Sequence, residues 1–340
     1  MPANANFSFD DVAILSVEAC EAPLVVTSAE VDQRLAPFYA RTRCPPGVVA
    51  SVAGIRERRQ WPADVSFTQA AAMAGDRAIA ASGVDRSEIG VIMDTSVSRD
   101  RLEPSSAVTV HHLLGLPANC LNFDVANACL GFVTGMHLAG ALIDSGQIDY
   151  ALLVDGEGTR ELYDNTIERL NESGNGLRDL LTNFATFTLG SGAAAMVLGR
   201  HSVHADGHRL LGGFSRADTK HHELCIGTLQ GGTTDTRALL EAGINLAAVT
   251  WEHAGAGDSW GGRDRYIFHQ VSEAHTNAMI EALDVEPERV PKTFPRYGNI
   301  GPAAIPITLA DVAGELASGD VVLCMGIGSG LNVGVIELRW

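Results

Sequence analysis

The sequence DVANACLGF (residues 124–132) joins a short apolar strand to a long apolar helix. The strand is LNFDV at 121–125, and the predicted helix runs from about Cys129 to Ser145 with residues that are nearly all apolar or glycine. A helix that is apolar on every side has to be buried. A buried helix entered directly from a strand indicates an α/β protein with this junction in its interior.

Strands and helices alternate around this junction. FTQAAAMAGDRAIAAS at 67–82 predicts a helix, and IGVIMDTS at 89–96 predicts a buried strand. A second helix is expected at 105–114, ending at Gly115. YALLVD at 150–155 predicts another buried strand. This alternation favours a sheet whose central strands are parallel.

The second half of the chain repeats features of the first. LGSGAAAMVL at 189–198 and IGSGLNVGVI at 327–336 are both Gly-Ser-Gly turns that enter an apolar strand. The strand at 89–96 likewise has a counterpart in RYIFHQVS at 265–272. Self-similarity of this kind predicts a duplicated structural unit.

Two such units predict an α/β fold with five layers, α/β/α/β/α. We expect one half at residues 1–200 and the other at 201–340. The apolar helices 130–145 and 303–317 are expected to lie between the two sheets, because only that position buries them on all sides. The polar stretch 156–187 interrupts the first half and predicts a cap insertion.

Composition restricts the functional classes. Hydrophobic residues make up 46% and charged residues 19%, which indicates a globular protein rather than a disordered one. The net charge of −17 argues against nucleic acid as a partner, which needs a basic face. No apolar stretch approaches the roughly 20 residues of a membrane span, and the N-terminal residues lack the basic region of a secretory signal.

The six cysteines are scattered, with no CxxC pair, which argues against a disulfide framework and a structural zinc site. We therefore expect no metal and a reducing, cytoplasmic location. The cysteines are Cys20, Cys44, Cys120, Cys129, Cys225 and Cys324.

Cys129 is the candidate nucleophile because it lies where the strand ends and the buried helix begins. Unpaired backbone N–H groups and the positive end of the helix dipole favour a thiolate there. The same N–H groups can bind the oxygen of a carbonyl under attack. The alternative is a small buried core residue, which is the commoner role of a buried cysteine.

The second half offers two polar partners at equivalent positions. His269 follows the strand in YIFHQ and can donate a hydrogen bond to a carbonyl or enolate oxygen, or transfer a proton. Asn299 lies between a strand and an apolar helix, as Cys129 does in the first half, and can supply an amide donor to the same cleft. A structural histidine and a turn asparagine are the alternatives.

Four motifs follow one another along the chain: DVANACLGF at 124–132, HQVSEAHT at 269–276, YGNIGPAA at 297–304 and GIGSGLNVGVIELRW at 326–340. In this order they resemble the β-ketoacyl synthase III group of the thiolase superfamily. GIRERR at 54–59 fits the same group. The resemblance implies the five-layered thiolase fold and catalytic roles for Cys129, His269 and Asn299.

Within that group the chain looks like the OleA-type enzymes that condense two acyl-CoA molecules head to head. It has HQVS and GNIGP where the elongation enzymes have HQAN and GNTSA, and SRDRLEPSS at 98–106 resembles the segment whose glutamate enters the partner subunit's site. The resemblance implies a homodimer in which Glu103 is the base supplied to the partner chain. It also implies that the backbone N–H of Ser329 helps to bind the oxyanion.

The reaction implied is a Claisen condensation without decarboxylation. Cys129 takes the first acyl group, Glu103 removes an α-proton from the second acyl-CoA, and the carbanion attacks the acyl-cysteine to give a 2-alkyl-3-ketoacyl-CoA, as in olefin or β-lactone biosynthesis. A carboxylate desolvated at a dimer interface has the raised pKa that such a base needs. No metal or redox cofactor is required, and acyl-CoA thioesters are the expected partners.

Three other functions remain open at this point. A decarboxylating β-ketoacyl synthase III would use a malonyl carrier protein, and a thioesterase would release the same acyl-cysteine to water. A scaffold without catalytic activity would need none of these side chains.

Overall fold

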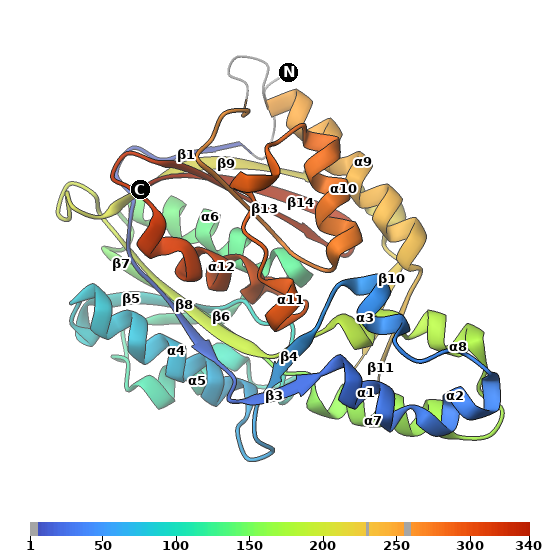
Figure 1. Cartoon of the computed structure of the whole chain (residues 1–340). Coiled ribbons are helices and arrows are strands. Elements are labelled where there is room, and N and C mark those ends of the chain that lie inside the picture. Colours follow the sequence, from blue (N-terminus) through green and yellow to red (C-terminus); the bar gives the residue numbers. More distant parts are fainter. Residues whose placement is uncertain (1–5, 229–230, 255–259) are drawn as a thin grey trace.

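The computed structural model describes residues 6–228, 231–254 and 260–340. Most of its strands form one ten-stranded sheet in the order β12-β13-β14-β9-β2-β8-β7-β5-β6, with β1 beside β9 (Figure 1). The strands are β1 (Asn6–Ser8), β2 (Ala13–Glu21), β5 (Ile89–Asp94), β6 (Leu121–Asp124), β7 (Tyr150–Glu157), β8 (Gly192–Gly199), β9 (His208–Ala217), β12 (Arg265–Phe268), β13 (Val321–Gly328) and β14 (Asn332–Arg339).

The sheet consists of two halves that repeat the same pairing. In the first half β5 is parallel to β7, and β8 is antiparallel to both β7 and β2. In the second half β12 is parallel to β13, and β14 is antiparallel to both β13 and β9. The predicted duplication is therefore confirmed, with β8 matching β14 and β5 matching β12. The halves join where β2 pairs with β9 at only two positions.

Helices complete the five layers. Helices α4 (Phe67–Ser82) and α5 (Ser106–Leu114) cover the outer face of the first half, while α9 (Thr236–Ala254) and α10 (Glu273–Leu283) cover the outer face of the second. Helices α6 (Gly131–Asp144) and α12 (Ala304–Val312) lie side by side in the middle (Figure 1). Each central helix contacts strands of both halves, which confirms the α/β/α/β/α fold.

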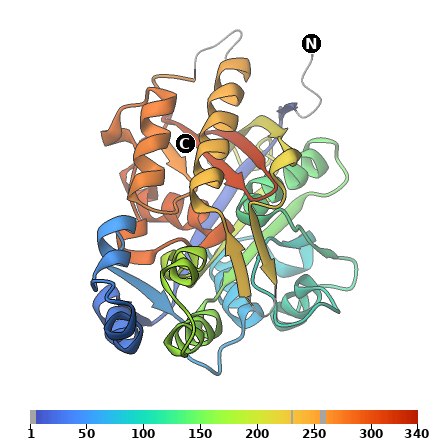
Figure 2. The ribbon, with the colours of Figure 1, turned by 90° about the vertical axis from the view of Figure 1, so that its right-hand side faces the viewer.

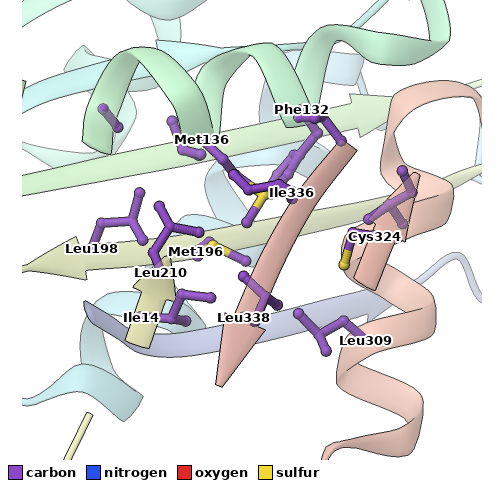
Figure 3. Close-up of a cluster of buried hydrophobic side chains, with 14 of the residues drawn as sticks. Ile14, Phe132, Met136, Met196, Leu198, Leu210, Leu309, Cys324, Ile336 and Leu338 are labelled. Atoms are coloured by element: carbon purple, nitrogen blue, oxygen red, sulfur yellow. The ribbon is translucent and has the colours of Figure 1, made fainter. Parts of the chain in front are cut away.

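The central layer contains the largest apolar cluster. Side chains of α6 such as Phe132 and Met136 pack against Ile336 and Leu338 of β14, and Leu309 of α12 closes the other side (Figure 3). All of these side chains are almost fully buried. A helix enclosed between the two halves of the sheet has no side facing water, which explains why the sequence of α6 has no polar face.

The helix predictions at 67–82 and 105–114 agree with α4 and α5 to within one residue. The helix expected from Cys129 begins two residues later, after the 3₁₀ turn η2 (Ala128–Leu130). The helix expected at 303–317 is shorter, because α12 gives way to the 3₁₀ turn η7 (Ala313–Glu315).

A cap of short helices lies beside the sheet. The segment between β7 and β8 forms α7 (Arg160–Asn171), α8 (Leu177–Thr182) and the 3₁₀ helix η3 (Phe184–Thr188), within the stretch expected as an insertion. The N-terminal segment adds α1 (Ser28–Arg34), α2 (Ala36–Thr42) and α3 (Val48–Ala53). These helices share an apolar cluster that includes Phe38, Tyr163 and Phe187. The boundary at residue 200 falls between β8 and β9 and stays a prediction.

Two small sheets and two short turns complete the fold. Strands β3 (Leu24–Thr27) and β4 (Glu57–Gln60) form one, and β10 (Cys225–Thr228) and β11 (Gly231–Thr234) form the other. Figure 2 shows the β10–β11 pair running from the second half toward the cap. The turns that matter below are α11 (Phe294–Tyr297) and the 3₁₀ turn η6 (Gly301–Ala303). None of the helices in the described ranges is both long and apolar enough to cross a bilayer.

Candidate active site

Cys129 lies in η2, the tight turn between β6 and α6. The turn is strained at Ala128, whose φ of 45° is unusual for a residue with a side chain. Two glycines allow the backbone of the turn and that of neighbouring segments to approach each other closely. A Cβ at Gly131 would lie 2.4 Å from the carbonyl oxygen of Thr95, and one at Gly328 would lie 2.8 Å from that of Asn127. Only glycine allows both approaches.

His269 and Asn299 come from the second half, each at the end of a strand or turn. The backbone N–H of His269 donates to the Met325 carbonyl on β13 (2.8 Å), and its side chain is buried. Asn299 is fixed by backbone hydrogen bonds to Thr188 (2.7 Å) and from Gly190 (2.8 Å). Its side-chain Oδ1 accepts from the Gly301 N–H (3.0 Å), which leaves the amide NH₂ as a donor.

Gly301 is the point at which these residues meet. It bonds to Asn299, and its backbone forms a hydrogen bond with His269. The turn η6 that begins at Gly301 packs against η2, which carries Cys129. The structure therefore brings the three predicted residues to one place, where the two central helices begin.

Burial keeps Cys129 protonated at rest. Together with neighbouring Cys225, Glu157 and Asp155, it raises the pKa of the thiol to about 12. The helix start was expected to favour the thiolate, but desolvation outweighs it. Attack by this thiol on a substrate would therefore require loss of its proton during the reaction rather than before it.

His269 is neutral for the same reason. Burial and the nearby His275 lower the pKa of its imidazole to about 3, with the Gly301 backbone opposing them. A neutral imidazole can donate one hydrogen bond and accept another. Together with the Asn299 amide it can bind a carbonyl or enolate oxygen without a formal positive charge.

The other two predicted residues lie in different settings. Ser329 is in the turn between β13 and β14, directly after Gly328, which packs on η2. Its backbone is therefore beside the Cys129 turn. Glu103 is exposed on the segment between β5 and α5. Among the described residues, no hydrogen bond or ion pair joins its side chain to η2, which carries Cys129.

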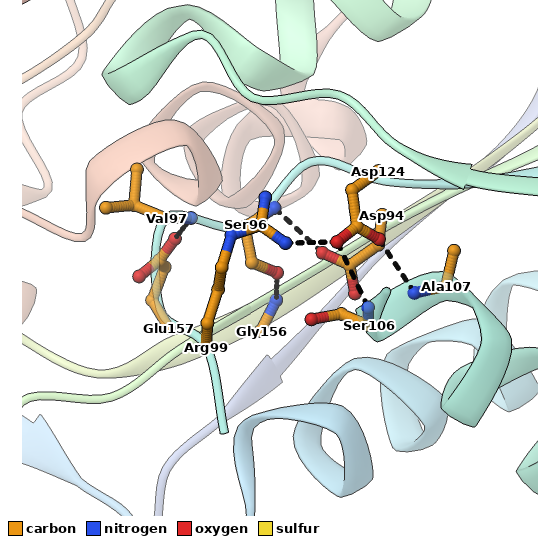
Figure 4. A network of polar contacts seen from close by, with 9 residues as sticks. All are labelled: Asp94, Ser96, Val97, Arg99, Ser106, Ala107, Asp124, Gly156 and Glu157. Carbon is orange, nitrogen blue, oxygen red and sulfur yellow. Dashed lines mark hydrogen bonds and ion pairs between the residues drawn. The ribbon is translucent and has the colours of Figure 1, made fainter. Parts of the chain in front are cut away.

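The sequence reading missed two buried acids beside Cys129. Asp155 and Glu157 lie at the end of β7, and burial raises the pKa of both carboxyl groups, that of Glu157 to about 7. Glu157 accepts hydrogen bonds from the segment that follows β5 (Figure 4). The pattern was visible in YALLVDGE at 150–157, because acids that alternate at the end of a buried strand point to one face.

The fold and this arrangement define a class. A duplicated α/β/α/β/α stack with a cysteine at the start of its first central helix, and polar donors at the start of the second, is the architecture of condensing acyltransferases of the thiolase superfamily.

Comparisons with known proteins agree. Residues 123–219 match the family model 3-oxoacyl-[acyl-carrier-protein] synthase III, and residues 262–340 match the C-terminal model of the same family. An acyl-CoA:acyl-CoA alkyltransferase of Xanthomonas campestris is 41% identical, covering 98% of this chain and 99% of its own. One from Shewanella oneidensis is 36% identical, over 94% and 96%. A β-ketoacyl synthase III of Geobacillus kaustophilus is 28% identical, over 84% and 87%.

Solved structures give the same answer. OleA of Xanthomonas campestris superposes with a TM-score of 0.95 at 40% identity, covering 98% of this chain and 99% of its own. A further OleA structure holds lauric acid and lauroyl-CoA, also at a TM-score of 0.95 and 40% identity, over 98% and 100%. The chain belongs to the OleA-type acyl-CoA:acyl-CoA alkyltransferases, a branch of the β-ketoacyl synthase III group.

Proposed function

We propose that the protein condenses two long-chain acyl-CoA molecules, without decarboxylation, to a 2-alkyl-3-ketoacyl-CoA and free CoA. The observation that carries the proposal is the convergence of Cys129, His269 and Asn299 on the η2–η6 contact. The alkyltransferase relatives support the substrate class, and so does the OleA structure with lauroyl-CoA. The proposed reaction needs no metal or redox cofactor.

The first half-reaction is acyl transfer. The Cys129 sulfur attacks the thioester carbonyl of one acyl-CoA, and the backbone N–H groups of Cys129 and Ser329 bind the oxyanion. The thioester bond to CoA breaks and CoA takes the thiol proton. The structure supports these roles by placing the Ser329 turn against η2.

The second half-reaction forms the carbon–carbon bond. His269 and Asn299 bind the thioester oxygen of the second acyl-CoA while Glu103 of a partner chain removes the α-proton. The carbanion attacks the acyl-cysteine, and Cys129 leaves and is reprotonated. Solved OleA structures include variants of a glutamate and a cysteine that are separated by the same number of residues as Glu103 and Cys129.

A homodimer is part of the proposal. Strand β6 is an edge strand of the sheet, and Leu121 on it is 55% exposed. Near Glu103, Val97 is 52% and Leu102 is 78% exposed. An edge strand next to exposed apolar side chains favours pairing with a second copy. A reducing, cytoplasmic compartment is also proposed, because all six cysteines are free.

The test is to incubate the protein with lauroyl-CoA alone. Mass spectrometry is expected to detect an acyl adduct on Cys129 and then the 2-alkyl-3-ketoacyl-CoA. Cys129→Ala removes both, whereas the matched variant Cys120→Ala, at a buried cysteine outside the site, keeps both. Sedimentation of the protein measures the dimer.

Two outcomes contradict the proposal. A product that requires malonyl thioester and releases carbon dioxide indicates a decarboxylating synthase. Free lauric acid without condensed product indicates a thioesterase.

A further inference from the structure

The segment that carries Glu103 is anchored at both ends and exposed at its tip. We define residues 97–105 as the Glu103 loop. Arg101, Leu102, Glu103 and Pro104 at its tip are all exposed. The ends, in contrast, are bound to buried groups of the same chain (Figure 4). A loop fixed in this way can present one side chain outward in a defined position.

Glu157 anchors the start of the loop. Its Oε1 accepts from the Val97 N–H (2.6 Å), and its Oε2 accepts from both the N–H (3.1 Å) and the hydroxyl (2.5 Å) of Ser98. Both oxygens of Glu157 thus accept hydrogen bonds from the first two residues of the loop. Glu157 is 5% exposed, so water does not replace these bonds easily.

Separate groups anchor the rest of the loop. Asp124, at the end of β6, forms an ion pair with Arg99 and accepts from the N–H of Ser106 (3.0 Å), where α5 begins. Asp100 accepts from the hydroxyl of Thr68 on α4 (2.9 Å). Neither acid forms a hydrogen bond with η2 or η6 in the described residues. Glu157 is therefore the anchor that also borders the site.

The other face of Glu157 meets the active site of its own chain. A Cβ at Gly301 would lie 3.6 Å from the Glu157 carboxyl, so that carboxyl borders the residue that fixes Asn299. Glu157 is also near enough to Cys129 to act on its thiol electrostatically. The buried Glu157 side chain thus lies beside the active site of its own chain and also binds the Glu103 loop, which extends away from that site.

We propose that Glu157 is a positioning residue for carbon–carbon bond formation, which holds the Glu103 loop so that the base reaches the active site of the partner chain. The inference rests on the proposed function, because it assumes a dimer with Glu103 acting in trans. It predicts that Glu157 of one chain matters to the condensation catalysed at Cys129 of the other.

Glu157→Gln is the first variant. The amide keeps the shape of the side chain but replaces one carboxylate oxygen by an NH₂ group, so either the Val97 N–H or the Ser98 N–H loses its acceptor and the loop is held less firmly. A shift of about 1 Å in a reacting group can cost roughly 100-fold in rate. We expect the condensation rate to fall by about that factor, and by far more than the rate of acyl-Cys129 formation. Ser98→Ala removes one hydrogen bond to Glu157 from the loop side. It is expected to lower the condensation rate by a smaller factor and to leave acylation unchanged.

Mixed dimers separate the loop from the site. Each mixed dimer is purified through two affinity tags, one on each chain, and contains one intact Cys129. In the first, a Cys129→Ala chain is paired with a Glu157→Gln chain, so the working site receives Glu103 from a chain with intact Glu157. In the second, both substitutions are in one chain and the other is wild type, so the working site receives Glu103 from the released loop. We expect about half of the wild-type condensation from the first and roughly 100-fold less from the second.

The opposite order would overturn the inference, because it would show that Glu157 acts within its own site. Equal activity of the two mixed dimers, loss of acylation in Glu157→Gln, or a monomeric protein would also overturn it. If the Glu157→Gln chain does not fold, Ser98→Ala in the same two pairings gives the same comparison. A wild-type dimer that fails to condense lauroyl-CoA would instead refute the proposed function.

Discussion

Replacing Gly131 with alanine tests whether the close seat of α6 on the sheet positions the nucleophile. Gly131 is the first residue of α6 and has ordinary helical φ and ψ angles. Alanine therefore fits the backbone, and its helix propensity alone would stabilise the helix by about 1 kcal/mol. The obstacle is space rather than conformation.

The size of the effect follows from the contact. The new Cβ would lie 2.4 Å from the Thr95 carbonyl oxygen and 3.2 Å from that of Val125, both of them backbone atoms. Carbon and oxygen normally approach to about 3.3 Å, so the helix start has to move by about 1 Å. Overpacking of this kind costs about 1–3 kcal/mol, which exceeds the gain in propensity. The same shift at Cys129, two residues away, is expected to slow acylation roughly 100-fold.

Two measurements check this, the rate of acyl-Cys129 formation by mass spectrometry and the thermal unfolding midpoint. Gly243→Ala is the matched control. Gly243 is also a buried helical glycine, in α9, but its Cβ would meet nothing closer than Ile327 at 3.7 Å. We expect Gly243→Ala to leave activity unchanged and to stabilise the protein by about 0.5–1 kcal/mol. A Gly131→Ala protein with wild-type acylation and stability would refute the reasoning.

Three further predictions concern charge and hydrogen bonding. Because burial raises the pKa of Cys129 to about 12, its alkylation by iodoacetamide is expected to accelerate about tenfold per pH unit up to at least about pH 10, and a plateau below about pH 9 would contradict this. Burial also raises the pKa of Asp94 to about 6 when folded, so the stability that this carboxyl contributes is complete below about pH 3.8 and lost as the pH rises through about 6. Asp94→Asn is therefore expected to raise the thermal unfolding midpoint more at pH 8 than at pH 4. An equal change at the two pH values would refute this. Asn299→Asp replaces the amide donor by an acceptor, so we expect acyl-Cys129 to form while condensation falls at least about 100-fold, and unchanged condensation would exclude Asn299 as an oxygen-binding group.

The sequence predicted the fold well because the relevant patterns are local. Each half has Gly-Ser-Gly turns and apolar strands that can be matched by eye, and β8 and β14 confirm the match. The same logic located Cys129 and His269, which follow β6 and β12. Asn299 was expected after a strand, and that was wrong, because the short helix α11 precedes it and Asn299 forms only an isolated bridge with Leu189. Helix starts were less accurate, because the strained η2 turn before α6 depends on the approach of Thr95 and Gly328 from other strands.

Glu157 shows what the sequence could not provide. The alternation of Asp155 and Glu157 at the end of an apolar run indicates that the two acids share a face, but not which residues that face meets. The role of Glu157 depends on Val97 and Gly301, which come from other elements and meet only in the folded protein. The direction of the Cys129 pKa shift has the same origin, because burial is set by the surrounding layers.

The raised pKa of Cys129 is consistent with the proposed chemistry once the protons are followed. In acyl transfer one thiol replaces another, so the proton lost by Cys129 is taken up by the departing CoA, and no resting thiolate is required. In the condensation step, the neutral His269 and the Asn299 amide bind the enolate oxygen as hydrogen-bond donors and do not themselves change charge. The one group that has to arrive ionised is then the base, Glu103. Because the other groups of the site are neutral, the condensation rate depends most directly on the position of this one exposed carboxylate. Glu157 is the buried residue that holds its loop.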